Sequence, residues 1–148
     1  MRKITLLVAL LALLAGCGKN IAPTPPAPTP LAEKDFTITA NFTYDFTNFA
    51  ACSTTVTTGC ISGFQWGYMK SSVQVQLHSA ATSVCTGATQ PESCIDTTNS
   101  QLPMGSLIFY VDATIVDNNG LAGTTGAIFS SPVVVAAGTP SSLTVTLK

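Results

Sequence analysis

Apolar and polar residues alternate strictly over long stretches of this chain. From Phe36 to Phe46 every second residue is apolar, and Thr, Asn or Asp residues stand between them. A period of two puts all the apolar side chains on one face of an extended strand, so these stretches predict half-buried β-strands. Only 9% of the residues are charged, and the β-branched residues that fill many of the other positions suit a pleated sheet. The same alternation recurs over residues 64–68, 73–77, 107–115 and 143–147.

Turn sequences separate the predicted strands. Asp117-Asn118-Asn119-Gly120 and Gly138-Thr139-Pro140 carry residues that accept positive φ or fix a bend. A short Val-rich strand is expected over residues 133–135. Six or seven strands in about 115 residues favour an all-β fold, an antiparallel two-sheet sandwich of the immunoglobulin-like kind. We expect this domain to span residues 35–148.

The chain begins with a different kind of segment. Arg2 and Lys3 are followed by an uncharged, mostly apolar run over residues 4–15 and then by Gly16 and Cys17. A basic start, a short apolar run and a small-residue exit predict a secretory signal peptide. The run is shorter than the roughly 20 apolar residues that a membrane-spanning helix needs.

The end of this segment, Leu14-Ala15-Gly16-Cys17, resembles the lipobox of bacterial lipoproteins. The resemblance implies acylation of the Cys17 sulfur with a fatty acid such as palmitate, and removal of residues 1–16. It also implies a location in the bacterial cell envelope. Gly18 after the cysteine resembles outer-membrane sorting in enteric-type lipoproteins. Residues 17–34 are rich in proline and threonine and predict an extended linker between the lipid and the domain.

A second resemblance concerns the C-terminal part of the chain. A corner sequence, Leu102 to Ser106, is followed by a long apolar strand, the Asp117–Gly120 turn, and Ser130-Ser131-Pro132 before a Val-rich strand. This order resembles the second half of a fibronectin type III or related immunoglobulin-like domain. The last two Val/Thr strands would equally suit a transthyretin-like sandwich.

Four cysteines remain once Cys17 is assigned to the lipid. An even number in an exported domain predicts two disulfides. Short separations in turn-rich segments favour the local pairs Cys52–Cys60 and Cys85–Cys94, although three pairings are possible. The spacings are longer than those of structural zinc sites, so we expect no metal.

Few residues are available for catalysis. His78 is the only histidine, and alternation with Val73, Val75 and Leu77 predicts that it is exposed. No serine lies in a nucleophile elbow, and no spacing singles out a carboxylate pair. Turn geometry alone accounts for the polar residues that follow Asp117, so we expect no strong calcium site there. We therefore expect no enzyme and no cofactor.

The net charge limits the kinds of binding partner that we expect. From Glu33 onward there are three basic and seven acidic residues, a net charge of −4, which disfavours nucleic acid. The membrane is expected to be reached through the lipid alone, and the other partner is an unknown protein or glycan.

Three aromatic residues share one face of a predicted strand: Phe64, Trp66 and Tyr68. Such rings belong most often to a core, and alternatively they form a platform that stacks on sugar rings. The sequence thus predicts a lipid-anchored envelope protein whose β-sandwich is a non-catalytic binding or structural module. The alternatives are a carbohydrate-binding module that uses this row and, more weakly, a small envelope hydrolase.

Overall fold

The computed structural model describes residues 32–148. The predicted signal peptide, Cys17 and most of the linker lie outside these residues. Within them no helix is long and apolar enough to cross a membrane. The strands are β1 (Glu33–Tyr44), β2 (Cys60–Lys70), β3 (Val73–Ala81), β4 (Cys85–Thr86), β5 (Glu92–Pro103), β6 (Gly105–Val116), β7 (Ala122–Phe129), β8 (Val133–Val135) and β9 (Ser142–Thr146), with a short 3₁₀ turn, η1 (Thr82–Val84), before β4.

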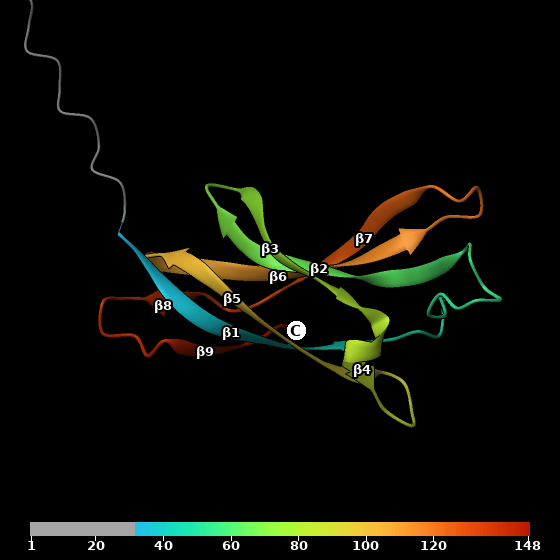
Figure 1. Ribbon diagram of the computed structural model, residues 1–148, viewed down its shortest axis with the longest axis horizontal. Coiled ribbons are helices and arrows are strands. Elements are labelled where there is room, and N and C mark those ends of the chain that lie inside the picture. The colour runs from blue at the N-terminus through green and yellow to red at the C-terminus, as the bar shows by residue number, and fades with distance from the viewer. Residues whose placement is uncertain (1–31) are drawn as a thin grey trace, which may run out of the picture. The chain divides into compact units, whose positions relative to one another are not determined.

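The strands form two sheets that pack face to face (Figure 1). The first sheet has the order β4-β5-β1-β9. The second has the order β3-β2-β6-β7, with β8 paired to the start of β6. All strand pairs are antiparallel except β1 with β9, which run parallel. The predicted all-β, two-sheet sandwich is confirmed.

The core lies between the two sheets and comes from the alternation that the sequence shows. In β1 the even-numbered residues Phe36 to Phe42 are 0–3% exposed, and the residues between them face outward. Burying apolar side chains from both inner faces stabilises the sandwich by about 25 cal/mol per Å² removed from water. The opposite sheet contributes mainly Ile61, Phe64, Trp66, Tyr68, Leu107, Phe109, Val111 and Ala113.

The strand boundaries differ from the expectation at the N-terminal end. The first strand starts at Glu33 and ends at Tyr44, whereas alternation predicted a strand over residues 36–46. Lys34 explains part of the difference, because its Nζ lies 5.3 Å from the centre of the Phe36 ring and bonds the Thr139 carbonyl oxygen. These contacts hold the start of the strand on the body of the domain.

The turns predicted from sequence are present. Asp117 Oδ1 accepts hydrogen bonds from the backbone N–H groups of Asn119 and Leu121, both at 2.8 Å, and Gly120 has φ = 79°. The Thr139 N–H donates to the Ala136 carbonyl oxygen at 3.0 Å between β8 and β9.

A β-bulge changes the direction of one side chain in β3. Trp66 pairs with His78, whereas the next residue, Gly67, pairs with Gln76, so Leu77 is the extra residue. The bulge reverses the alternation beyond Leu77. His78 therefore lies opposite Trp66 and close to Asp96 of the other sheet, and 39% of its side chain is exposed, so the predicted exposure is only partial.

Candidate functional site

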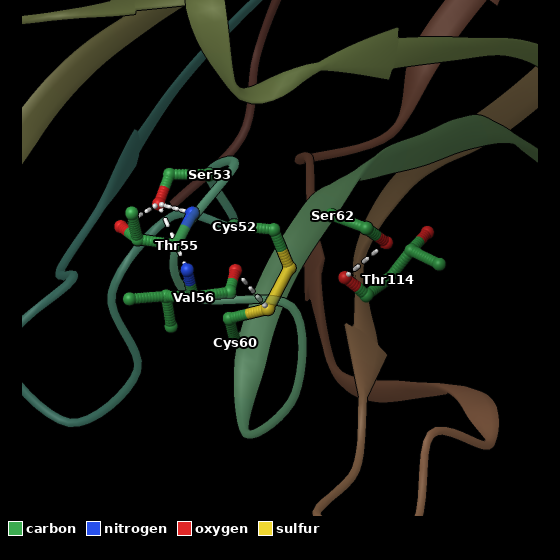
Figure 2. Close-up of a disulfide and its surroundings, with 7 residues drawn as sticks. All are labelled: Cys52, Ser53, Thr55, Val56, Cys60, Ser62 and Thr114. Atoms are coloured by element: carbon green, nitrogen blue, oxygen red, sulfur yellow. Dashed lines mark hydrogen bonds between the residues drawn. A yellow bond between two sulfur atoms is a disulfide. The ribbon is translucent and has the colours of Figure 1, made fainter.

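The Cys52–Cys60 disulfide anchors a polar loop to the first residue of β2 (Figure 2). The Cα atoms are 5.0 Å apart, and the backbone N–H of Cys52 donates to the Ile61 carbonyl oxygen at 2.8 Å. Ser53 shapes the loop, because its Oγ accepts hydrogen bonds from the backbone N–H groups of Thr55 and Val56.

Two further contacts surround this disulfide in Figure 2. Cys60 Sγ lies 3.4 Å from the Val56 carbonyl oxygen, and since an oxidised sulfur has no proton, this is a close contact and not a hydrogen bond. The Ser62 hydroxyl donates to the Thr114 carbonyl oxygen at 3.1 Å and ties β2 to β6. The disulfide and the hydrogen bonds of Ser53 hold the loop in place, which suits a structural role.

The second disulfide joins Cys85 and Cys94, which stand opposite each other on β4 and β5. Both residues are buried, with Cys94 fully so. The prediction of local pairing is confirmed for both pairs. The second bridge fixes β4, only two residues long, to the edge of the first sheet.

The aromatic row lies inside the core. Phe64, Trp66 and Tyr68 are 1%, 0% and 6% exposed. The Phe64 ring packs edge-on against Phe42 and Tyr44 at centroid distances of 5.0 and 5.1 Å. The expectation that these rings belong to the core is confirmed. The alternative that they form a platform for sugar rings is wrong, because the opposite sheet covers them.

A polar cluster that the sequence did not reveal links the two sheets beside this row. Trp66 Nε1–H donates to Asp96 Oδ2 at 2.7 Å, and His78 Nε2 lies 3.6 Å from the same oxygen. Thr98 Oγ1 lies 3.5 Å from the other His78 ring nitrogen. Trp66 and His78 come from the second sheet, and Asp96 and Thr98 come from β5 in the first. These contacts join side chains of the two sheets, so the cluster links the layers.

The turn at Asp117 does not gather further ligands. Its carboxylate accepts hydrogen bonds from backbone N–H groups, chiefly that of Leu121, and these bonds lower the pKa of Asp117 below its ordinary value. Among residues 32–148 no group of three His, Cys, Asp or Glu side chains stands close enough to hold a metal ion.

From Thr37 of β1 onward, the outer face of the first sheet carries an array of uncharged side chains, all of them polar except the exposed Ile95. Register places Thr37 beside Asn99 and Ser142, and Thr39 beside Thr97 and Thr144. The Thr37 hydroxyl donates to Asn99 Oδ1 at 2.8 Å, and the Thr39 and Thr97 hydroxyl oxygens are 3.1 Å apart. We call this array the hydroxyl face. Its members are Thr37, Thr39, Asn41, Thr43, Ser93, Ile95, Thr97, Asn99, Gln101, Ser142, Thr144 and Thr146.

Two hollows lie at the ends of the hydroxyl face. One, of about 530 Å³, is lined by Thr37, Asn99 and Ser142 among others. The second, of about 370 Å³, is lined by residues that include Asn41 and Thr146. Asn41 Oδ1 is buried and has no hydrogen-bond partner within residues 32–148. An orphan acceptor beside a hollow is a place where a ligand hydroxyl or a water could donate.

Comparison with known proteins assigns neither a family nor a function to the chain. The chain matches no protein-family profile, no curated protein and no solved structure.

Proposed function

We propose that this chain is a lipid-anchored protein of the bacterial cell envelope whose β-sandwich acts as a non-catalytic binding module. The Leu14-Ala15-Gly16-Cys17 sequence supports the anchor, and Gly18 favours the outer membrane. The immunoglobulin-like resemblance of residues 102–135 agrees with a module that presents a sheet surface to a ligand.

The observation that carries this proposal is the hydroxyl face. None of its twelve members is charged, and they stand in register across three strands. Neighbouring strands lie about 4.8 Å apart, and residues i and i+2 lie about 6.7 Å apart, so hydroxyl and amide groups repeat over the surface. Repeated neutral donors and acceptors match a neutral, hydroxyl-rich polymer such as a polysaccharide. Asp35 and Lys148 line the hollows at its two ends, so charged groups are absent from the array itself and present only at these margins.

Binding is tested with the full chain and neutral polysaccharides in a co-sedimentation assay, with an anionic polysaccharide for comparison. We expect retention on neutral polymers that changes little with salt, because screening acts on charges. Thr144→Lys should abolish retention, since it places a long charged side chain on the face. Thr124→Lys adds the same charge to β7 of the other sheet and should leave retention intact. Equal retention of both variants would refute the assignment of the face.

The anchor is tested separately by fatty-acid labelling in bacterial cells. We expect label on the wild-type chain and none on Cys17→Ala, which should also keep residues 1–16. Labelling of both variants, or of neither, would refute the anchor and leave the binding face untouched.

A further inference from the structure

One edge of the first sheet carries backbone groups without partners. Strand β5 pairs with β1 along its whole length, but on its other side it pairs only through Ser93 and Cys94, with the two residues of β4. Beyond them, no strand within residues 32–148 covers the edge from Ile95 to Gln101. Edge strands of this length are ready to pair with another strand.

The hydrogen bonds of β1 show which groups of β5 are free. Thr37 N–H donates to the Ser141 carbonyl oxygen, and the Asn41 carbonyl oxygen accepts from Leu147 N–H, so odd-numbered residues of β1 bond toward β9. Even-numbered residues of β1 therefore bond toward β5, where register pairs them with even-numbered residues such as Asp96 and Thr98. It follows that odd-numbered residues of β5 direct their N–H and C=O groups to the open edge.

Three of these residues lie clear of β4: Thr97, Asn99 and Gln101. All three are exposed. Within residues 32–148, their backbone N–H and C=O groups have no hydrogen-bond partner other than β1. None of them is charged or proline, the residues that usually guard such an edge. Asp96 and its neighbours of even number face the inner side, where Trp66 donates to the Asp96 carboxylate.

We propose that this edge pairs with the same edge of a second copy, as an antiparallel β5–β5 contact centred on Asn99. In that register Asn99 stands opposite its counterpart, and Thr97 stands opposite Gln101 of the other copy. The contact forms about six backbone hydrogen bonds, two for each pair of opposed residues. A register centred closer to Ile95 would bring the second copy against β4, so the position of β4 sets the register.

A second copy fits this edge better than an unrelated strand, because the edge is complementary to itself. Asn99 side chains can exchange amide hydrogen bonds across the two-fold axis, and Thr97 and Gln101 are a neutral polar pair. Such an isologous contact closes after two copies and does not continue into a fibre. The contact area is small, so we expect an affinity of about micromolar or weaker.

The test uses the full chain, in detergent where it carries lipid, and measures sedimentation as a function of concentration. We expect a monomer–dimer equilibrium. Asn99→Lys places two like charges directly opposite each other and should weaken the dimer at least about tenfold. Thr124→Lys makes the same charge change on β7 and should leave the dimer constant unchanged. A monomer at all concentrations up to about millimolar would overturn the proposal, as would dimers of Asn99→Lys that match the wild type.

A second variant tests the register by cross-linking. Opposed residues of a hydrogen-bonded pair have Cα atoms about 5.5 Å apart, within the range of a disulfide. Asn99→Cys should therefore form a covalent dimer on mild oxidation, and Thr124→Cys should not. Equal cross-linking of the two variants, or cross-linking of Thr124→Cys alone, would refute the β5 edge as the interface. Both tests are independent of the ligand, so loss of polysaccharide binding leaves their result unaffected.

Discussion

Trp66 offers the sharpest test of how the two sheets are held together. It is fully buried and donates its indole N–H to Asp96 on the opposite sheet at 2.7 Å. Burying a tryptophan removes about 200 Å² from water, worth up to about 5 kcal/mol. A hydrogen bond to a carboxylate adds about 1.5–3 kcal/mol. Trp66→Ala should accordingly cost at least about 3–5 kcal/mol, a large share of the 5–15 kcal/mol that stabilises a typical domain.

The hydrogen bond can be separated from the packing with a smaller change. Trp66→Phe keeps an aromatic ring in the core but leaves the Asp96 carboxylate, 12% exposed, without its indole donor. We expect a loss of about 3 kcal/mol in the free energy of unfolding. Tyr68→Phe, on the same strand and also buried, loses only a hydroxyl and serves as the control, with an expected cost below about 1 kcal/mol.

Urea unfolding followed by far-UV circular dichroism measures these differences, provided that the slope with urea is unchanged. Combining Trp66→Phe with Asp96→Asn completes a double-mutant cycle, and we expect a coupling energy of at least about 1 kcal/mol. Additive costs, or a Trp66→Phe variant within about 0.5 kcal/mol of the wild type, would show that the bond does not link the sheets. In the wild type, Trp66 emission should be blue-shifted and should move to the red on unfolding.

Three other changes test the fold locally. Gly67→Ala should lower the free energy of unfolding by about 1–3 kcal/mol or more, because its Cβ would lie 1.9 Å from a carbonyl oxygen of β3. Gly123→Ala is the control, since its Cβ would meet only a side-chain carbon at 3.8 Å. It should cost less in the same urea titration. The Asp117 carboxyl should titrate below its ordinary pKa near 3.8 in an NMR titration, so its stabilisation of the turn is complete above that pH and is lost as the pH falls through the lowered pKa. Replacing both Cys52 and Cys60 with serine should lower stability by about 2.5 kcal/mol, and an unchanged urea midpoint would contradict this.

Alternation in the sequence was sufficient to predict the strands whose inner faces are apolar. It located β1, β2, β6 and β9 to within a few residues because each buries a row of apolar side chains against the opposite sheet. The two disulfides were predictable for a related reason. Short loops bring cysteines together without help from the rest of the fold, so local spacing was enough.

Strand β5 could not be predicted from the same pattern. Its inner positions include Asp96, Thr98 and Ser100, which register places beside Ala40, Ile38 and Phe36 of β1. An alternation of polar with polar residues has no signature in the sequence. The strand is held by β1, by the local Cys85–Cys94 bridge and by the Trp66–Asp96 bond, and the first and last of these join segments that are distant in the sequence.

The cluster around His78 was missed because of the bulge in β3. One extra residue, Leu77, turns every later side chain of the strand to the other face, and no residue type in the Val73–Ala81 sequence marks the place where this occurs. The hydroxyl face is the converse case. Its threonines are visible in the sequence, but only the register across β5, β1 and β9 aligns them.

The β5 edge and the hydroxyl face have a joint consequence for binding. Pairing two β5 strands would place two hydroxyl faces side by side on one continuous sheet, because Thr97, Asn99 and Gln101 belong to both features. A long polysaccharide could then contact both copies at once, whereas a short oligosaccharide would contact one. Linking two sites in this way raises the apparent affinity for the polymer without any new contact.

One variant should therefore distinguish binding of a long polysaccharide from binding of a short oligosaccharide. Asn99→Lys, measured at concentrations where the wild type is dimeric, should lose affinity for long chains by about 10²-fold or more. Its affinity for a short oligosaccharide should fall less, by no more than Thr144→Lys costs, because both variants place a lysine on the hydroxyl face. Thr144→Lys should weaken binding of long and short chains to the same extent, because it acts on the face and not on the edge. Equal losses for long and short chains in Asn99→Lys would show that the edge does not join two binding faces.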